Sequence, residues 1–226
     1  MAVAAKRALR KQVQEVLKKL TPEERTKQSA EIFSKLVALP EYKNSRRVSV
    51  FLSREDEVST DEIVIDLLKS NKSCYIPKQL TGDDMEMVKI ESVEELKTLP
   101  KNSFGIREVP ASEEREDALA SGGVDLMILP GLAFTATGKR LGKGKGYYDR
   151  YILKARKVRS PILVGIAFRQ QIVPDIPVTE MILMQTLSLV RDIWSSIIPQ
   201  LTYLKNISKR WQKSQIGPFV GNYREE

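Results

Sequence analysis

Histidine is absent from this sequence of 226 residues, and cysteine occurs only once. Without an imidazole, the protein can form neither a Ser-His catalytic pair nor a zinc site that uses histidine. A single cysteine excludes a disulfide within the chain and fits a reducing compartment. Any chemistry that the protein performs must therefore use carboxylates, lysines, tyrosines or a bound metal.

The one cysteine, Cys74, lies in the segment Ser-Cys-Tyr-Ile-Pro. This segment is typical of a strand, because aromatic and β-branched residues favour extended backbone. A buried, inert thiol is expected here in preference to a nucleophile.

The chain also lacks a hydrophobic run long enough to cross a bilayer. Residues 181–190 are apolar, but the run is short, and Pro199 interrupts the next apolar segment. Residues 1–5 are too few for a secretory signal, and charged residues come directly after them. The early cations weakly resemble a transit peptide, yet the helix that they begin is needed by the fold. We expect a cytoplasmic protein that contacts no membrane.

Acidic residues are fewer than basic ones, 29 against 37, which gives a formal net charge of +8. This charge favours an anionic partner, and nucleotides, polyglutamates, nucleic acids and membranes all qualify. Aromatic residues do not alternate with the cations except at Tyr147 and Tyr148. Because single-stranded nucleic acids are bound by interleaved cations and aromatics, we expect no nucleic acid partner.

Hydrophobic periodicity predicts alternating helices and strands, and hence an α/β fold. Two helices precede the first strand, and the second begins at Thr21-Pro22, where threonine is the expected cap. The predicted helices cover residues 6–20, 22–40, 60–69 and 147–155, with a short helix or turn at 93–99. The predicted strands cover residues 47–52, 74–76, 85–90, 124–129 and 162–168.

Residues 137–150 have the composition of a phosphate-binding loop. Two tyrosines and Asp149 come at its end and begin a helix. Before them, glycines alternate with cations: Gly138, Lys139, Arg140, Gly142, Lys143, Gly144, Lys145 and Gly146. Glycine lets successive N–H groups converge on an anion, and the helix dipole adds positive potential. Asp149 could then hold Mg²⁺ beside bound phosphates. A mobile, solvated basic loop has the same composition, and neither G-x-x-x-x-G-K-[ST] nor G-x-G-x-x-G is present.

The position of this loop favours a binding site. It comes after the strand predicted at residues 124–129, which Pro130-Gly131 ends. The order of strand, glycine-rich loop and helix places the loop at the carboxyl edge of the sheet, where open α/β sheets bind ligands.

Two of these segments together resemble the signature of one enzyme family. They are Leu129-Pro-Gly-Leu-Ala-Phe134 and, after a short spacer, residues 138–149. The signature is that of 5-formyltetrahydrofolate cyclo-ligase, also called methenyltetrahydrofolate synthetase: Pro-Gly-x-x-Phe, then Arg-Leu-Gly-[Arg/Lys]-Gly-x-Gly-Tyr-Tyr-Asp. Residues 5–10, 51–57 and 85–88 agree with the same family, so the resemblance covers about residues 4–180.

The resemblance implies a three-layer α/β/α fold with a mostly parallel sheet, and an ATP-dependent ligase of one-carbon metabolism. ATP would phosphorylate the formyl oxygen of 5-formyltetrahydrofolate, and N10 would attack the resulting iminium carbon. Loss of phosphate would leave the 5,10-methenyl product and ADP. The partners implied are ATP, Mg²⁺ and a reduced folate, with or without a polyglutamate tail, and we expect a monomer.

Site residues are implied by the resemblance, position by position. Arg140, Lys145 and Tyr147 would be catalytic, and Asp149 would hold Mg²⁺. Folate would be bound by Leu52, Glu57, Phe104, Lys143, Gly144, Lys145, Gly146 and Tyr147. ATP would be bound by Lys6, Arg7, Ala8, Leu9, Arg10, Arg140, Leu141, Gly142, Lys143, Gly144, Lys145, Gly146, Tyr147 and Tyr148. Two of these have structural alternatives: Glu57 as an ordinary loop carboxylate and Tyr148 as a packing residue.

The ending of the chain departs from the family pattern. After Glu180 the family continues with a segment that contains a second Mg²⁺-binding aspartate, whereas this chain reads Met-Ile-Leu-Met-Gln-Thr-Leu. Asp192 is out of register. We therefore predict a cyclo-ligase-like domain at residues 1–180 and an atypical, partly disordered tail at 181–226. A catalytically weakened isoform that binds folate or nucleotide is the alternative function.

Overall fold

A computed structural model describes residues 2–80, 82, 84–102 and 105–177. Its centre is a five-stranded sheet in the order β3-β2-β1-β4-β7. Strands β1, β2, β4 and β7 are parallel, and the edge strand β3 runs antiparallel to β2. The strands are β1 (Arg47–Val50), β2 (Ser73–Gln79), β3 (Met85–Ile90), β4 (Leu126–Leu129) and β7 (Ile162–Gly165).

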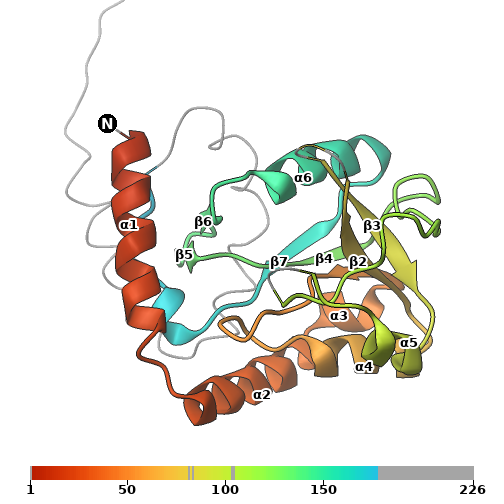
Figure 1. The fold of residues 1–226 in the computed structure, drawn as a ribbon, viewed down its shortest axis with the longest axis horizontal. Coiled ribbons are helices and arrows are strands. Elements are labelled where there is room, and N and C mark those ends of the chain that lie inside the picture. Colours follow the sequence, from red (N-terminus) through yellow and green to blue (C-terminus); the bar gives the residue numbers. More distant parts are fainter. Residues whose placement is uncertain (1, 81, 83, 103–104, 178–226) are drawn as a thin grey trace, which may run out of the picture.

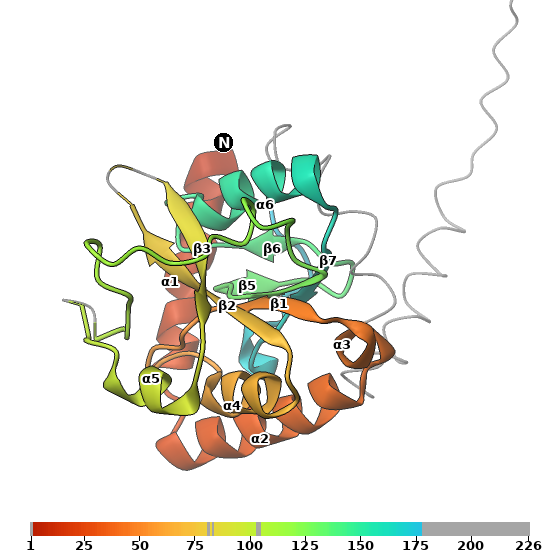
Figure 2. The same ribbon diagram turned by 90° about the vertical axis from the view of Figure 1, so that its right-hand side faces the viewer.

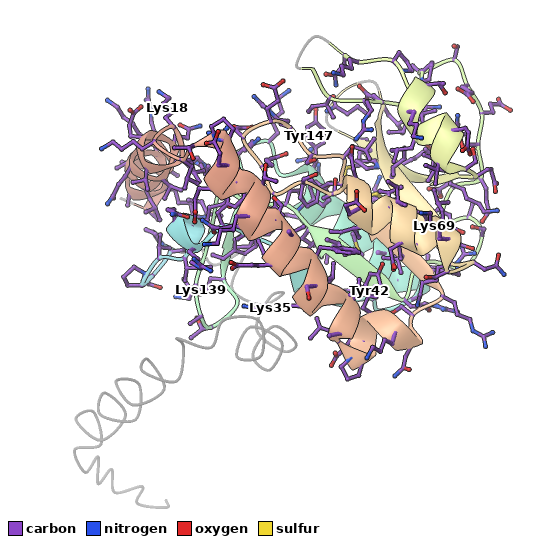
Figure 3. The ribbon with its side chains drawn as sticks, turned by 90° about the horizontal axis from the view of Figure 1, so that it is seen from below. Lys18, Lys35, Tyr42, Lys69, Lys139 and Tyr147 are labelled. Atoms are coloured by element: carbon purple, nitrogen blue, oxygen red, sulfur yellow. The ribbon has the colours of Figure 1, made fainter. Side chains whose placement is uncertain are left out.

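Helices cover both faces of this sheet. On one side lie α2 (Pro22–Ala38), α3 (Pro40–Asn44), α4 (Asp61–Lys69) and α5 (Val93–Thr98), and on the other lies α6 (Tyr147–Val158) (Figure 2). Figure 3 shows α2 crossing below the sheet with α4 beside it, and marks Lys69 at the end of α4. Helix α1 (Ala2–Leu17) stands at one end of the sheet (Figure 1). The predicted three-layer α/β/α arrangement is confirmed.

The strands alternate their side chains between two cores. Along β4, Leu126 and Ile128 belong to the core under α2 and α4, whereas Met127 and Leu129 belong to the core under α6. Such a fully apolar strand is typical of a sheet that is covered on both faces. The same alternation places Cys74 in the α2–α4 core, where it is fully buried, as predicted.

Two local signals have the predicted structural cause. Thr21 begins α2 by accepting a hydrogen bond from the Glu24 N–H at 3.2 Å, with Pro22 in the first helical position. Gly146 begins α6 in the left-handed region, at a φ of 73°. The start of α2 is therefore set by a threonine cap and a proline in the first turn, and the start of α6 by a glycine with positive φ.

Some elements differ from the sequence prediction. The strand predicted at 162–168 ends at Gly165, and the chain continues into a short 3-10 helix, η1 (Arg169–Gln171). Helix α3 was not predicted. It has only five residues, from Pro40 to shortly before β1, and so short a segment carries too little hydrophobic periodicity. A small sheet formed by β5 (Ala133–Phe134) and β6 (Arg140–Leu141) was also missed.

Two predictions concern residues outside the described part of the chain. The tail at 181–226 is one, and Phe104 is the other. Within the described residues, no helix is both long and apolar enough to span a bilayer.

Candidate active site

A cavity of about 900 Å³ opens at the carboxyl end of the sheet. Leu52 and Glu57, after β1, line it together with Pro130 and Gly131, after β4. The glycine-rich loop at 137–150 contributes most of its residues to another wall. The volume lies in the range of small-molecule sites, and its place matches the rule for ligand sites in open α/β sheets.

The Pro-Gly-x-x-Phe segment has a packing reason for its glycine. An ideal Cβ on Gly131 would lie 2.4 Å from Cζ of Phe134, so any side chain here would collide with the ring. Phe134 belongs to β5, which pairs with β6 as a short hairpin. The Thr135 hydroxyl accepts a hydrogen bond from the Lys139 N–H at 3.0 Å and closes the turn between them. The hairpin holds the start of the loop against the end of β4.

Arg140 is fixed by three neighbours. One Nη donates to the Pro130 carbonyl at 3.1 Å, and the other donates to Asp149 Oδ1 at 2.5 Å. Its guanidinium also lies 5.8 Å from the centroid of the Tyr148 ring. The side chain is only 9% exposed. A guanidinium held in this way presents its charge without further ordering, because its rotamers are already restricted.

Lys143 connects the loop to the segment after β1. Its Nζ lies 2.7 Å from Glu57 Oε1, and the other oxygen of Glu57 accepts a hydrogen bond from the Arg54 N–H at 3.1 Å. Tyr148 lies near this carboxylate. Burial raises the pKa of the Tyr148 phenol, Glu57 raises it further and Arg140 lowers it. Tyr148 is therefore a neutral phenol near a carboxylate and a guanidinium.

Lys145 and Tyr147 also line the cavity. Lys145 Nζ is 5.7 Å from the Tyr147 ring centroid, and the Arg150 guanidinium is 5.5 Å from it. Figure 3 labels Tyr147 and Lys139, which belong to this region. The ring orders cations at the mouth of the site through cation–π attraction.

Helix α1 presents two faces to the site. Lys6 and Arg10 line the main cavity, and Arg10 Nε donates to the Gly142 carbonyl at 2.9 Å. Arg7 and Ala8 instead line an adjoining depression of about 550 Å³, which Arg10 and Lys143 also touch. Leu9 lines neither and packs against the core. The predicted ATP-binding segment thus splits by helical periodicity, because residues four apart share a face.

Magnesium fits this site only with help from a ligand. Among the described residues, no cluster of three or more acids or cysteines could hold a metal ion. Asp149 offers one carboxylate, already paired with Arg140. Since Mg²⁺ in proteins is often held by one or two carboxylates plus substrate phosphates, Asp149 is compatible with an ion that arrives with a nucleotide.

Comparison with known proteins identifies the family of this chain. The sequence model of the 5-formyltetrahydrofolate cyclo-ligase family matches residues 2–184. The chain belongs to this family.

Relatives support the assignment in sequence and in structure. A 5-formyltetrahydrofolate cyclo-ligase of Mus musculus is 44% identical over 180 residues, 78% of this chain and 89% of its own. A probable one from Caenorhabditis elegans is 34% identical over 179 residues, with 77% and 87% covered. The structure resembles that of the Aquifex aeolicus 5,10-methenyltetrahydrofolate synthetase, with a TM-score of 0.62, 33% identity, and 77% and 83% covered.

One wall of the cyclo-ligase cavity was not found from the sequence. Asn102 and Glu108 line it, together with Gln79 at the end of β2. Glu108 accepts hydrogen bonds from the Gln79 N–H at 3.1 Å and the Asn102 amide at 2.8 Å. Asparagine and glycine at 102 and 105 are turn-forming residues, and this was the available signal. Only Phe104 was predicted from this region of the sequence.

Proposed function

We propose that this protein converts 5-formyltetrahydrofolate to 5,10-methenyltetrahydrofolate, with conversion of ATP to ADP and phosphate. One observation carries the proposal. A single cavity is lined by the glycine-rich loop, by Lys6 and Arg10, and by Leu52 and Glu57. Cations for a polyphosphate and a carboxylate for an N–H donor therefore lie within one small-molecule volume.

The reaction needs no protein nucleophile. The formyl oxygen takes the γ-phosphoryl group of ATP, the bond to ADP breaks, and an iminium phosphate forms. N10 then attacks the iminium carbon and loses its proton, and phosphate leaves as the methenyl bridge closes. Positioning and charge neutralisation are the main contributions of the protein, as in phosphoryl transfer generally. The absence of histidine is compatible with this chemistry.

Each side chain has a role that fits its surroundings. Arg140, held rigidly by Pro130 and Asp149, faces the transferred phosphoryl group. Lys145 and Lys6 neutralise the other phosphates, and Tyr147 orders the loop at the cavity mouth. Glu57 accepts hydrogen bonds from the pterin ring. Magnesium, when bound with ATP, neutralises phosphate charge, and Asp149 is the residue that would hold it.

The test is direct. Purified protein is mixed with Mg-ATP and 5-formyltetrahydrofolate, and the methenyl product is measured by absorbance. Product that depends on both substrates is expected. A folded protein that binds both ligands without turnover would contradict the enzymatic proposal and favour the catalytically weakened isoform.

We also propose that the protein acts in the cytoplasm as a monomer. A cyclo-ligase of Arabidopsis thaliana that is 33% identical over 192 residues is described as mitochondrial, so the compartment needs its own test. Cell fractionation and light scattering of the purified chain provide the two measurements. Recovery with mitochondria, or a mass of two chains, would contradict these proposals.

A further inference from the structure

The ion pair between Glu57 and Lys143 crosses the cavity between two segments far apart in sequence. Glu57 lies after β1, and Lys143 belongs to the loop between β6 and α6. Both residues line the main cavity. Among the described loop residues, Arg140 pairs with Asp149 and Lys139 pairs with Asp175. The Lys143 pair ties the loop to the β1 side.

The two partners differ in exposure and in how they are held. Glu57 is 15% exposed, and its second oxygen is held by the Arg54 N–H. Lys143 is 41% exposed and is flanked by Gly142 and Gly144, the latter at a φ of 126°. Lys143 also lines the adjoining depression beside Arg7, Arg10 and Lys11. The lysine can therefore turn from the carboxylate toward the basic side, whereas the carboxylate stays in place.

A pair with one half-exposed partner is weak, so exchange is easy. Exposed pairs of this kind contribute little to stability, since water and ions screen the attraction. A polyphosphate offers Lys143 several oxygens and more charge than one carboxylate. When Lys143 leaves, Glu57 Oε1 regains an open lone pair that can accept an N–H from a second ligand.

We propose that Glu57 and Lys143 couple the binding of the two substrates. The inference rests on the proposed function and names how its site is regulated. The nucleotide draws Lys143 toward its phosphates and thereby frees Glu57 for the N–H donors of the reduced folate. Folate bound to Glu57 likewise releases Lys143. Each ligand alone must break the pair, and the second ligand does not, so each tightens the binding of the other.

The experiment measures this coupling directly. Calorimetry gives the Kd of a non-hydrolysable ATP analogue with and without saturating 5-formyltetrahydrofolate. The protein as it stands should bind the analogue about two- to fivefold more tightly with folate present, which is the scale of an exposed ion pair. In Glu57→Gln and in Lys143→Met this ratio should fall toward one. In the double variant the ratio should fall no further than in either single variant, because each substitution already removes the same ion pair.

Controls separate coupling from simple loss of contact. Lys143→Arg keeps the cation and should keep the ratio. Lys154 is 48% exposed, close to the 41% of Lys143, and its pair with Asp84 lines neither cavity. Lys154→Met should therefore leave the ratio unchanged. Thermal unfolding verifies that each variant is folded. Variants that bind one ligand more weakly but keep the original ratio would overturn the coupling.

Failure of the proposed function gives a different result. If the unaltered protein binds neither ligand, the function fails and the coupling with it. If it binds both and forms methenyl product, yet the ratio is one or is equal in all variants, the function stands and the coupling is wrong.

Discussion

The ring of Phe134 occupies the space in which a Cβ of residue 131 would lie, at 2.4 Å from Cζ and 2.7 Å from Cε2. Real Cβ atoms do not approach a neighbour so closely. A single missing methyl group therefore lets β5 fold back on the end of β4 and present the glycine-rich loop to the cavity. At the scale of single residues, Gly131 and Phe134 of the family signature therefore have a packing role.

Replacement of this glycine tests the packing argument. Gly131→Ala should lower the free energy of unfolding by about 1–3 kcal/mol, the usual cost of overpacking. Chemical denaturation measures it. Phe134→Leu in the same chain should recover part of the loss, because the smaller side chain leaves room for the new methyl. Additive losses in the double variant would show that the ring is not the cause.

The thiol of Cys74 should be inert in the folded protein. It is fully buried, and burial raises its pKa, so little thiolate forms at neutral pH. A thiol reagent should react with it only after denaturant is added. Stoichiometric reaction within minutes under native conditions would mean that β2 is accessible.

Two charged side chains should matter for nucleotide use. Lys145→Ala and Asp149→Ala are each expected to raise the KM for ATP about tenfold, the scale of one charged hydrogen bond. Asp149→Ala also removes a partner of Arg140. Lys157→Ala, an exposed cation at the end of α6, is the matched control. Unchanged kinetics in both site variants, with normal unfolding temperatures, would remove the loop from the site.

At the scale of elements, Asp125 joins several ends of the fold. One of its oxygens accepts hydrogen bonds from the Arg46 and Arg47 N–H groups, each at 2.9 Å, at the start of β1. The other oxygen pairs with Arg159, just after α6. The carboxylate therefore fixes β1 and the end of α6 to the strand that precedes the cavity.

This carboxylate predicts a pH dependence of stability. Burial by itself would raise its pKa, but the two N–H donors and Arg159 lower it overall. A lowered folded pKa means that the stabilisation is complete above the unfolded pKa of about 3.9 and is lost as pH falls further, through the folded value. Asp125→Asn should cost about 1–2 kcal/mol at pH 7, and the difference should shrink below about pH 4.

Denaturation at several pH values provides the measurement. Glu15→Gln, which removes an exposed pair with Lys18 on α1, is the control and should leave stability unchanged. A loss for Asp125→Asn that stays constant down to about pH 2 would contradict an electrostatic role.

At the scale of the whole molecule, the described residues form both hydrophobic cores of the sheet. Both faces of the sheet are covered by helices that lie before residue 160. A chain ending at Glu180 should therefore unfold cooperatively, with a midpoint within about 4 °C of the full chain, equivalent to about 1 kcal/mol. Calorimetry of both proteins measures this. A larger loss, or a broad transition, would show that residues 181–226 complete the fold and are not a separate tail.

The sequence by itself determined the kinds of elements and the presence of the loop. Apolar periodicity depends on nearby residues, so Met85–Ile90 was predicted with its observed bounds and Asp61–Lys69 within a residue. The glycine and cation pattern of 137–150 is likewise local, as is the family signature that the comparisons confirmed. The hairpin of β5 and β6 was not predicted, because strands of two residues are too short to show a hydrophobic period.

Tertiary structure decided which of these residues meet. Only the packing of α1 at the end of the sheet brings Arg10 to the Gly142 carbonyl. Only the approach of two loops pairs Glu57 with Lys143, and only the fold brings Glu108 to the Gln79 N–H at the end of β2. These contacts join residues far apart in the chain, and local sequence patterns cannot encode them, because their geometry depends on how the whole sheet is covered.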